Sequence, residues 1–136
     1  MASNTLDHLG KLLLRVTVGG ILILHGFDKL FSGISGIEGM VMARGLPALF
    51  AWAVFIGELI APALVILGWY ARLGGLLIAA NMVTAVTLAH THQIFQLNQM
   101  GGWQLELQGL FLFGGLCIAL LGAGRYSVAG ANGVWN

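Results

Sequence analysis

Charged residues are scarce in this chain, since aspartate, glutamate, lysine and arginine make up only 8% of its 136 residues. Soluble domains carry about 25% of such residues, because they must cover a surface that faces water. Hydrophobic residues make up 58% of the chain, and its mean hydropathy is +0.90. This composition excludes a soluble enzyme and a disordered tail. The net charge of +1 gives no general attraction to nucleic acid, so the partner that the composition predicts is the lipid bilayer.

Cysteine is nearly absent, since Cys117 is the one cysteine of the sequence and lies inside an apolar run. A single cysteine forms no disulfide within the chain, and the sequence has no cysteine–histidine spacing typical of a metal site. We therefore expect no dithiol relay within this chain, no metal site and no covalently bound cofactor.

Long apolar runs are what the chain has in abundance. A transmembrane helix needs about 20 consecutive, mostly apolar residues, and four segments satisfy this requirement. They cover about residues 9–30, 47–69, 72–90 and 103–123. We therefore predict an all-α fold, an integral membrane four-helix bundle that forms a single transmembrane domain over residues 1–136.

The connection between the first and second spans has apolar residues at helical spacing, namely Ile34, Ile37 and Val41. This pattern predicts a short interfacial helix that lies along the membrane surface. The connection between the third and fourth spans is rich in glutamine and asparagine, which predicts a polar loop.

An even number of spans places both termini on the same side of the membrane. Four of the six basic residues are then on that side: Lys11, Arg15, Arg72 and Arg125. Lys29 and Arg44 are on the opposite side. Because basic residues favour the cytoplasmic face, we expect a multi-pass protein of the cell inner membrane with both termini in the cytoplasm.

Glu58 is the most costly residue of the spans, because it lies near the middle of the second one. A charge at a helix centre costs about 2.5–3.5 kcal/mol on insertion scales. Pro62, one turn later, removes a backbone donor and opens the helix around Glu58. Two interpretations follow. Glu58 is either part of a protonatable or ligand-binding site, or a neutral carboxyl that joins two helices by hydrogen bonds.

The other costly side chains gather in the half of the bundle that lies away from the termini. This clustering predicts a polar cavity that opens outward, with Glu58 at its floor. The ligand-binding residues are predicted to be His25, Lys29, Glu58, His90 and Glu106. The residues that support them are predicted to be Arg15, Asp28, Asn81, Arg72 and Arg125.

Some of these residues also have a simpler explanation. Arg15 is close enough to its helix end to extend its side chain to the interface. Glu106 lies in the first turn of the fourth helix, where a carboxylate complements the helix dipole. Asp28 and Lys29 can be neutralised by other charges of the same connection.

The order and spacing of several short motifs over residues 9–130 resemble the DoxX family of small four-helix bacterial membrane proteins. The matching pieces are Arg15 with Gly19-Gly20, His25-Gly26-Phe27-Asp28-Lys29-Leu30, Gly57-Glu58, Gly68 with Arg72, His90, Gly101-Gly102-Trp103 with Glu106, and Gly122-Ala123-Gly124-Arg125-Tyr126-Ser127. The sequence departs from the family pattern at Ala123 and at Val128-Ala129, which lie away from the predicted cavity.

The resemblance implies more than the residues alone. The chain is similar to the membrane subunit of a thiosulfate:quinone oxidoreductase, which implies a quinone as a non-covalent cofactor near the outer interface. It also implies that redox chemistry is carried by the quinone or by a partner subunit. On this resemblance we expect His90, rather than His92, to face the bundle.

Three functions remain open from the sequence. The first is a quinone- or lipid-binding membrane subunit linked to redox metabolism. The second is a small proton-coupled transporter that uses Glu58. The third is a structural or assembly subunit of a membrane complex, in which the chain forms homo-oligomers or binds other subunits. The sequence alone does not decide whether the chain is an enzyme.

Overall fold

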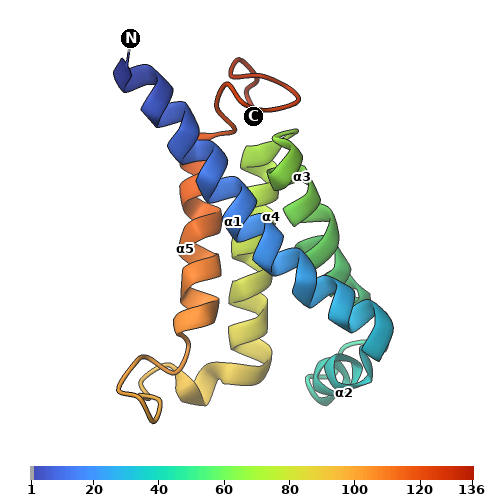
Figure 1. Ribbon diagram of the computed structural model, residues 1–136. Helices are drawn as coiled ribbons and strands as arrows, with labels where there is room; N and C mark the ends of the chain where they lie inside the picture. The colour runs from blue at the N-terminus through green and yellow to red at the C-terminus, as the bar shows by residue number, and fades with distance from the viewer. Residues whose placement is uncertain (1) are drawn as a thin grey trace.

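Residues 2–136 are described by a computed structural model, and they form helices joined by loops. The α-helices are α1 (Ala2–Ser32), α2 (Ser35–Ala43), α3 (Ala61–Leu67), α4 (Ala71–Ala85) and α5 (Glu106–Leu121). Shorter helical segments are η1 (Ala48–Ala53), η2 (Ile56–Ile60), η3 (Val86–His90) and η4 (Thr91–Gln93). Figure 1 shows both termini at one end of the bundle and α2 at the other end.

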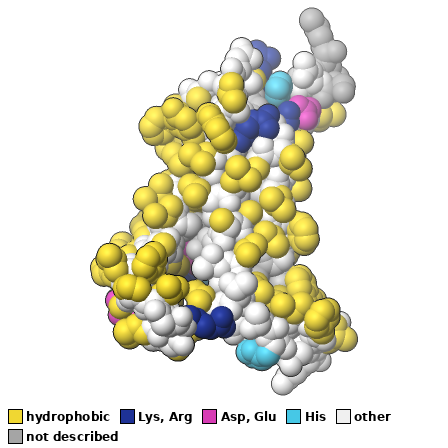
Figure 2. Space-filling model, turned by 180° about the vertical axis from the view of Figure 1, so that it is seen from behind, with side chains coloured by type: hydrophobic (Ala, Val, Ile, Leu, Met, Phe, Trp, Pro, Cys, Tyr) yellow, Lys and Arg dark blue, Asp and Glu magenta, His cyan; other side chains and the backbone are white. Residues whose placement is uncertain are grey.

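The membrane spans follow from these helices. Three stretches are long and apolar enough to cross a membrane, namely Asn4–Ser32, Ala48–Leu67 and Ala71–Gln93. The fourth, α5, is apolar but shorter, with 16 residues. The prediction of an all-α membrane bundle of four helices with a short helix between the first two spans is confirmed. Figure 2 shows hydrophobic side chains over the middle of the visible face, with basic and histidine side chains toward its two ends.

Small residues allow the helices to approach closely. This close packing matters because lipid tails are as apolar as leucine, so burial of leucine does not drive helices together in a membrane. Gly75 of α4 and Gly115 of α5 face each other, and a Cβ on Gly75 would lie 2.5 Å from the carbonyl oxygen of Gly115. Around this contact lies a core of buried apolar residues that includes Leu22, Ile78 and Ile118. This core extends from Ala71 and Ala123, at the end of the bundle near the termini, to Met82 and Phe111.

Two arginines hold the end of the bundle that carries the termini. The guanidinium of Arg15 donates to the carbonyls of Val65 and Ile66 at the end of α3, and also to Tyr126 in the C-terminal tail. Arg72 caps α5 in the same way, through the carbonyls of its residues 119 and 120. A cation there neutralises the negative end of the helix dipole. Both arginines are therefore bound within the protein, and Arg15 does not reach for the interface.

The opposite end of the bundle is built from α2 and from the loop after η4. Ile34, which directly precedes α2, and Val41 of α2 are buried with Ala51 of η1 in a second apolar cluster. Arg44 follows α2 and donates to the carbonyls of Thr87 and Leu88. Apolar residues of α2 thus pack on the bundle at the end that lies away from the termini.

The loop between η4 and α5 is held together by its own hydrogen bonds. A β-bridge joins Leu97 to Trp103, and the indole of Trp103 donates to the carbonyl of Ile94 over 2.7 Å. The side-chain oxygen of Asn98 accepts from the amides of Met100 and residue 102. The predicted polar loop is therefore an ordered hairpin.

Candidate functional site

The second span is irregular where it carries Glu58. Residues Ile56–Ile60 form a π-helical segment, and Pro62 follows in the first turn of α3. Because proline has no N–H to donate, the regular pattern of helix hydrogen bonds is broken here. Single π-helical turns often occur at functional sites. The opening of the helix that the sequence predicts around Glu58 is thus present as this π-helical turn.

Two glycines shape the surroundings of Glu58. A Cβ on Gly57 would collide with the side chain of Asn81, so the glycine gives this amide its place beside α4. A Cβ on Gly26 would collide with the carbonyl of Glu58, so α1 can approach the π-helical turn closely. The Gly26 and Gly57 positions therefore bring three helices together around one carboxylate.

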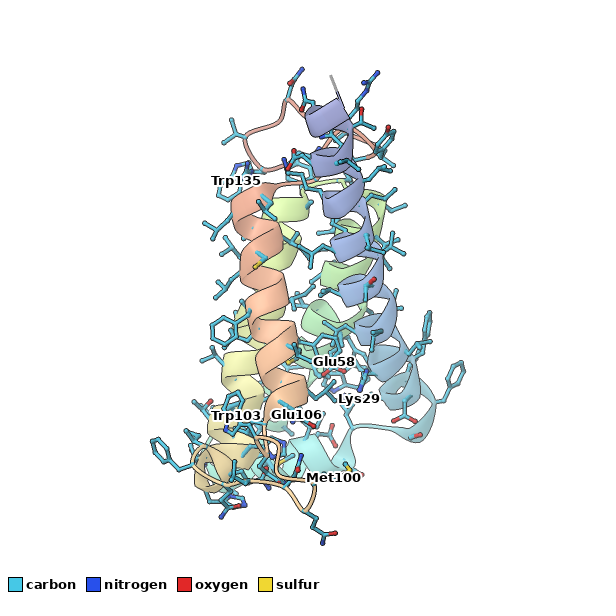
Figure 3. The ribbon with its side chains drawn as sticks, turned by 60° about the vertical axis from the view of Figure 1, so that its left-hand side comes forward. Lys29, Glu58, Met100, Trp103, Glu106 and Trp135 are labelled. Atoms are coloured by element: carbon cyan, nitrogen blue, oxygen red, sulfur yellow. The ribbon has the colours of Figure 1, made fainter. Side chains whose placement is uncertain are left out.

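Glu58 is paired with Lys29, as Figure 3 shows. The Nζ atom of Lys29 lies 2.5 Å from Oε2 of Glu58, and the side chains are 25% and 8% exposed. The amide of Asn81 donates to the other oxygen, Oε1, over 3.4 Å. Both carboxylate oxygens of Glu58 are thus engaged. Lys29 has three N–H donors, so it retains donors for another molecule.

A cavity of about 480 Å³ surrounds this pair. Small-molecule sites in proteins have volumes of about 300–1,000 Å³ and mostly apolar walls with a few placed polar groups. The polar side chains that line this cavity are His25, Lys29, Glu58, Asn81, Thr84, His90 and Gln108. Aliphatic and aromatic side chains, among them Leu22, Leu88 and Phe111, form most of its remaining wall.

The two histidines of the cavity are oriented by their Nδ1 atoms. Nδ1 of His25 lies 3.0 Å from the carbonyl oxygen of Ile21, which can only accept a hydrogen bond. The proton of the neutral ring is therefore on Nδ1, and Nε2 is left as an acceptor. The ring of His25 also meets Phe111 edge to face at 5.7 Å. Nδ1 of His90 is bound in a similar way to the side-chain oxygen of Gln93 at 3.0 Å.

The structure brings together four of the five residues predicted to bind a ligand. His25, Lys29, Glu58 and His90 line one cavity, whereas Glu106 does not. The carboxylate of Glu106 accepts a hydrogen bond from the amide of Asn98 in the hairpin, at the start of α5. Figure 3 shows it beside Trp103 and below the Lys29–Glu58 pair.

The residues predicted to support the site are divided between the two ends of the bundle. Asn81 contacts Glu58 directly, as described above. Asp28 is exposed and bonded to Ser32, one turn along α1. Arg15 and Arg72 cap helices at the far end, and Arg125 lies there too, against His8. His92 is exposed and does not line the cavity.

Sequence reasoning missed part of the cavity wall. Gln108 of α5 and Phe111, one turn later, line it, and Thr84 of α4 lines it from another side. Of these, Gln108 is an amide within an apolar span, and this polarity is the signal by which the sequence could have revealed it. Phe111 gives no such signal, because a phenylalanine in a membrane helix is ordinary.

A protein-family model matches the part of the chain that carries most of the cavity residues. The DoxX family model matches residues 10–91, which is more than half of the chain. The chain belongs to the DoxX family. The match contains Lys29, Glu58 and His90 and leaves the hairpin and α5 outside it.

A similarity to a curated protein extends further along this DoxX chain. The chain is 32% identical over 109 residues to a protein of Bacillus subtilis (strain 168) named "Putative oxidoreductase CatD". The alignment covers 80% of this chain and 81% of the relative. No solved structure was found to match the chain.

Proposed function

We propose that this DoxX-family protein is a membrane subunit linked to redox metabolism, and that it binds a quinone in the cavity around the Lys29–Glu58 pair. The observation that supports this most directly is a mostly apolar cavity with a cationic donor and an imidazole acceptor on its wall. The name of the relative, an oxidoreductase, agrees with a redox role.

The residues of the cavity suit the chemistry of a quinone headgroup. A quinone has an apolar ring with carbonyl oxygens that accept hydrogen bonds, and Lys29 has N–H donors that Glu58 does not use. The reduced form carries hydroxyl groups that donate, and Nε2 of neutral His25 can accept from them. A bound quinone would supply the electron- and proton-transfer chemistry that the side chains of this chain lack.

Glu58 has a positioning role in this proposal. Its two oxygens are occupied by Lys29 and Asn81, so its carboxylate holds the ammonium group against the cavity wall. Burial of a lone ammonium group in the membrane would be costly, and the carboxylate offsets this cost. Lys29 is then the group that contacts the ligand.

Binding of decylubiquinone to the purified protein tests the proposal. We expect the parent protein to bind it, and Lys29→Met to weaken binding by about tenfold or more, because a hydrogen bond from a charged donor is worth about 1.5–3 kcal/mol. Asp28→Asn is the matched control, since Asp28 is on the same helix, is exposed and does not line the cavity.

Other results would favour the other functions. A parent protein that shows no affinity for the quinone, with phospholipid as the one co-purifying ligand, would replace the quinone by a lipid. Proton movement that stops in Glu58→Gln would favour a proton-coupled transporter. A stable complex with another subunit, unaffected by Lys29→Met or Glu58→Gln, would favour a structural role.

We further propose an inner-membrane location with both termini in the cytoplasm. Both termini lie at one end of the bundle, the end that also carries Lys11, Arg15, Arg72 and Arg125. Basic residues favour the cytoplasmic side. Reporter fusions after residues 33 and 98 should therefore report the periplasm, and a fusion at residue 136 the cytoplasm. The reverse pattern would place the cavity in the cytoplasmic half.

A further inference from the structure

We infer that the ligand reaches the cavity sideways from the lipid, through a slit between the outer half of the second span and α4, and that the slit holds the apolar tail of the ligand. This inference rests on the proposed function, because it assigns the tail of an amphiphilic ligand to one part of the same site.

The two helices part just beyond Glu58. Toward the termini they pack closely, since a Cβ on Gly74 of α4 would lie 2.9 Å from the carbonyl oxygen of Ala61. At the level of Glu58, Gly57 contacts the side chain of Asn81. Further out, η1 packs on α2 instead of α4. The second span therefore leaves α4 at the level of the Lys29–Glu58 pair.

Where the two helices separate, each contributes residues that both line the cavity and are exposed. They are Phe50, Ala53 and Ile56 on the second span, and Ala80 and Thr84 on α4. A side chain that lines a cavity and is also exposed lies at its mouth. Three of these five are small, so the part of the mouth between Ala53 and Ala80 is a slit lined by small side chains.

Two further exposed residues of the cavity wall, Met40 of α2 and Leu107 of α5, lie outside the apolar spans Ala48–Leu67 and Ala71–Gln93, so the slit is the part of the mouth that lies within those two spans. At the outer end of the bundle, Ile37 and Val41 of α2 form part of the cavity wall, and Val41 is 3% exposed. Between α1 and α5, His25 meets Phe111 edge to face. The residues of the slit lie within the apolar spans Ala48–Leu67 and Ala71–Gln93. The slit therefore faces lipid rather than water.

A ligand that fits this arrangement has a polar headgroup and an apolar chain. The headgroup contacts Lys29, and the chain leaves between Ala53 and Ala80 into the bilayer. No apolar tail then has to cross the aqueous phase, and the headgroup reaches its donor without passing α2.

Filling the slit tests this route. Ala53→Phe and Ala80→Phe place a ring at its two sides. The matched controls are Ile60→Phe and Val83→Phe, which add a ring at exposed positions of the same spans that do not line the cavity. Two probes are titrated against each protein: decylubiquinone, and its tail-less dimethoxy-methyl-benzoquinone headgroup.

We expect the two slit variants to bind decylubiquinone about tenfold more weakly and the headgroup as well as the parent does, because the added ring occupies the space of the tail. The controls should match the parent for both probes. Headgroup binding by a slit variant also shows that it is folded.

Equal affinity of parent and slit variants for decylubiquinone would overturn the route, as would an equal loss for both probes. A parent that binds neither probe would instead overturn the proposed function, and with it the route. A parent that binds the headgroup as tightly as decylubiquinone would keep the proposed function and reject the slit as a tail site.

Discussion

The Lys29–Glu58 pair gives the sharpest stability prediction, because the two partners differ in burial. The side chain of Glu58 is 8% exposed and that of Lys29 is 25% exposed. Breaking a buried pair by removing one partner costs about 3–5 kcal/mol, since it leaves an uncompensated charge. The two single substitutions should therefore have unequal effects.

Lys29→Met leaves the carboxylate of Glu58 in the bundle with the amide of Asn81 as its remaining partner. We expect this variant to lose about 3 kcal/mol of the free energy of unfolding, at the lower end of the range because the pair is partly exposed. Glu58→Gln leaves Lys29, whose flexible side chain can turn its ammonium group toward the membrane interface at that end of α1. We expect a smaller loss, of about 1–2 kcal/mol.

The double variant, with both substitutions, should lose no more than Glu58→Gln alone, because it leaves no buried charge. The assay is an unfolding titration of each purified protein in detergent, read as a double-mutant cycle. Asp28→Asn is the control and should change the free energy by less than about 0.5 kcal/mol, since its side chain is exposed. Single variants that each lose less than about 0.5 kcal/mol, with additive effects, would refute the reasoning.

Three further predictions concern other parts of the chain. Gly26→Ala should lose about 3 kcal/mol of stability because its Cβ meets backbone atoms of the π-helical turn, whereas Gly20→Ala, with open space around it, should gain up to about 1 kcal/mol in the same titration. Arg15→Met should lose about 1.5–3 kcal/mol of the free energy of unfolding and expose the C-terminal tail to proteolysis. Arg125→Met changes an exposed residue and should do neither. A tail that stays intact in Arg15→Met would contradict the capping role. Cys117→Ala should bind decylubiquinone as the parent does, because this exposed thiol lies outside the cavity, and a loss of binding at normal expression would show that the thiol takes part.

The fold was largely predictable because apolar length is a strong signal in a membrane protein. The spans appear in the structure close to where hydropathy placed them, but their ends differ. α1 continues back to Ala2, since polar residues outside the lipid can still be helical, and hydropathy marks only the embedded part. α5 begins at Glu106 rather than near residue 103, because Trp103 belongs to the hairpin.

The cavity was predictable in part, because its polar residues are noticeable in an apolar span and its apolar residues are not. Glu58, Lys29 and His25 were found because a polar group in a span is costly and needs an explanation. Phe111 and Ala53 carry no such cost, so their place on the cavity wall follows only from how the helices cross. Glu106 lies in the first turn of α5, directly after the hairpin, and its carboxylate is bonded to Asn98 there instead of lining the cavity.

The sequence placed the arginines on one side of the membrane or the other, whereas the tertiary structure shows which groups each arginine binds. Arg15 caps α3, Arg72 caps α5, and Arg44 binds two carbonyls in the π-helical segment that ends the third span. Each therefore satisfies backbone acceptors that a helix end or a broken helix leaves open.

Among the basic side chains other than histidine in residues 2–136, Lys29 is the one that lines the cavity. Lys29 lies in the last turn of α1, where a cation also complements the helix dipole, but the group it bonds is a carboxylate from the middle of another span. A bundle that needed only to be stable could carry apolar side chains at both positions, since a buried pair is often no more stable than its apolar replacement. A charged pair on the wall of a ligand-sized cavity is therefore what the proposed binding function predicts at these two positions.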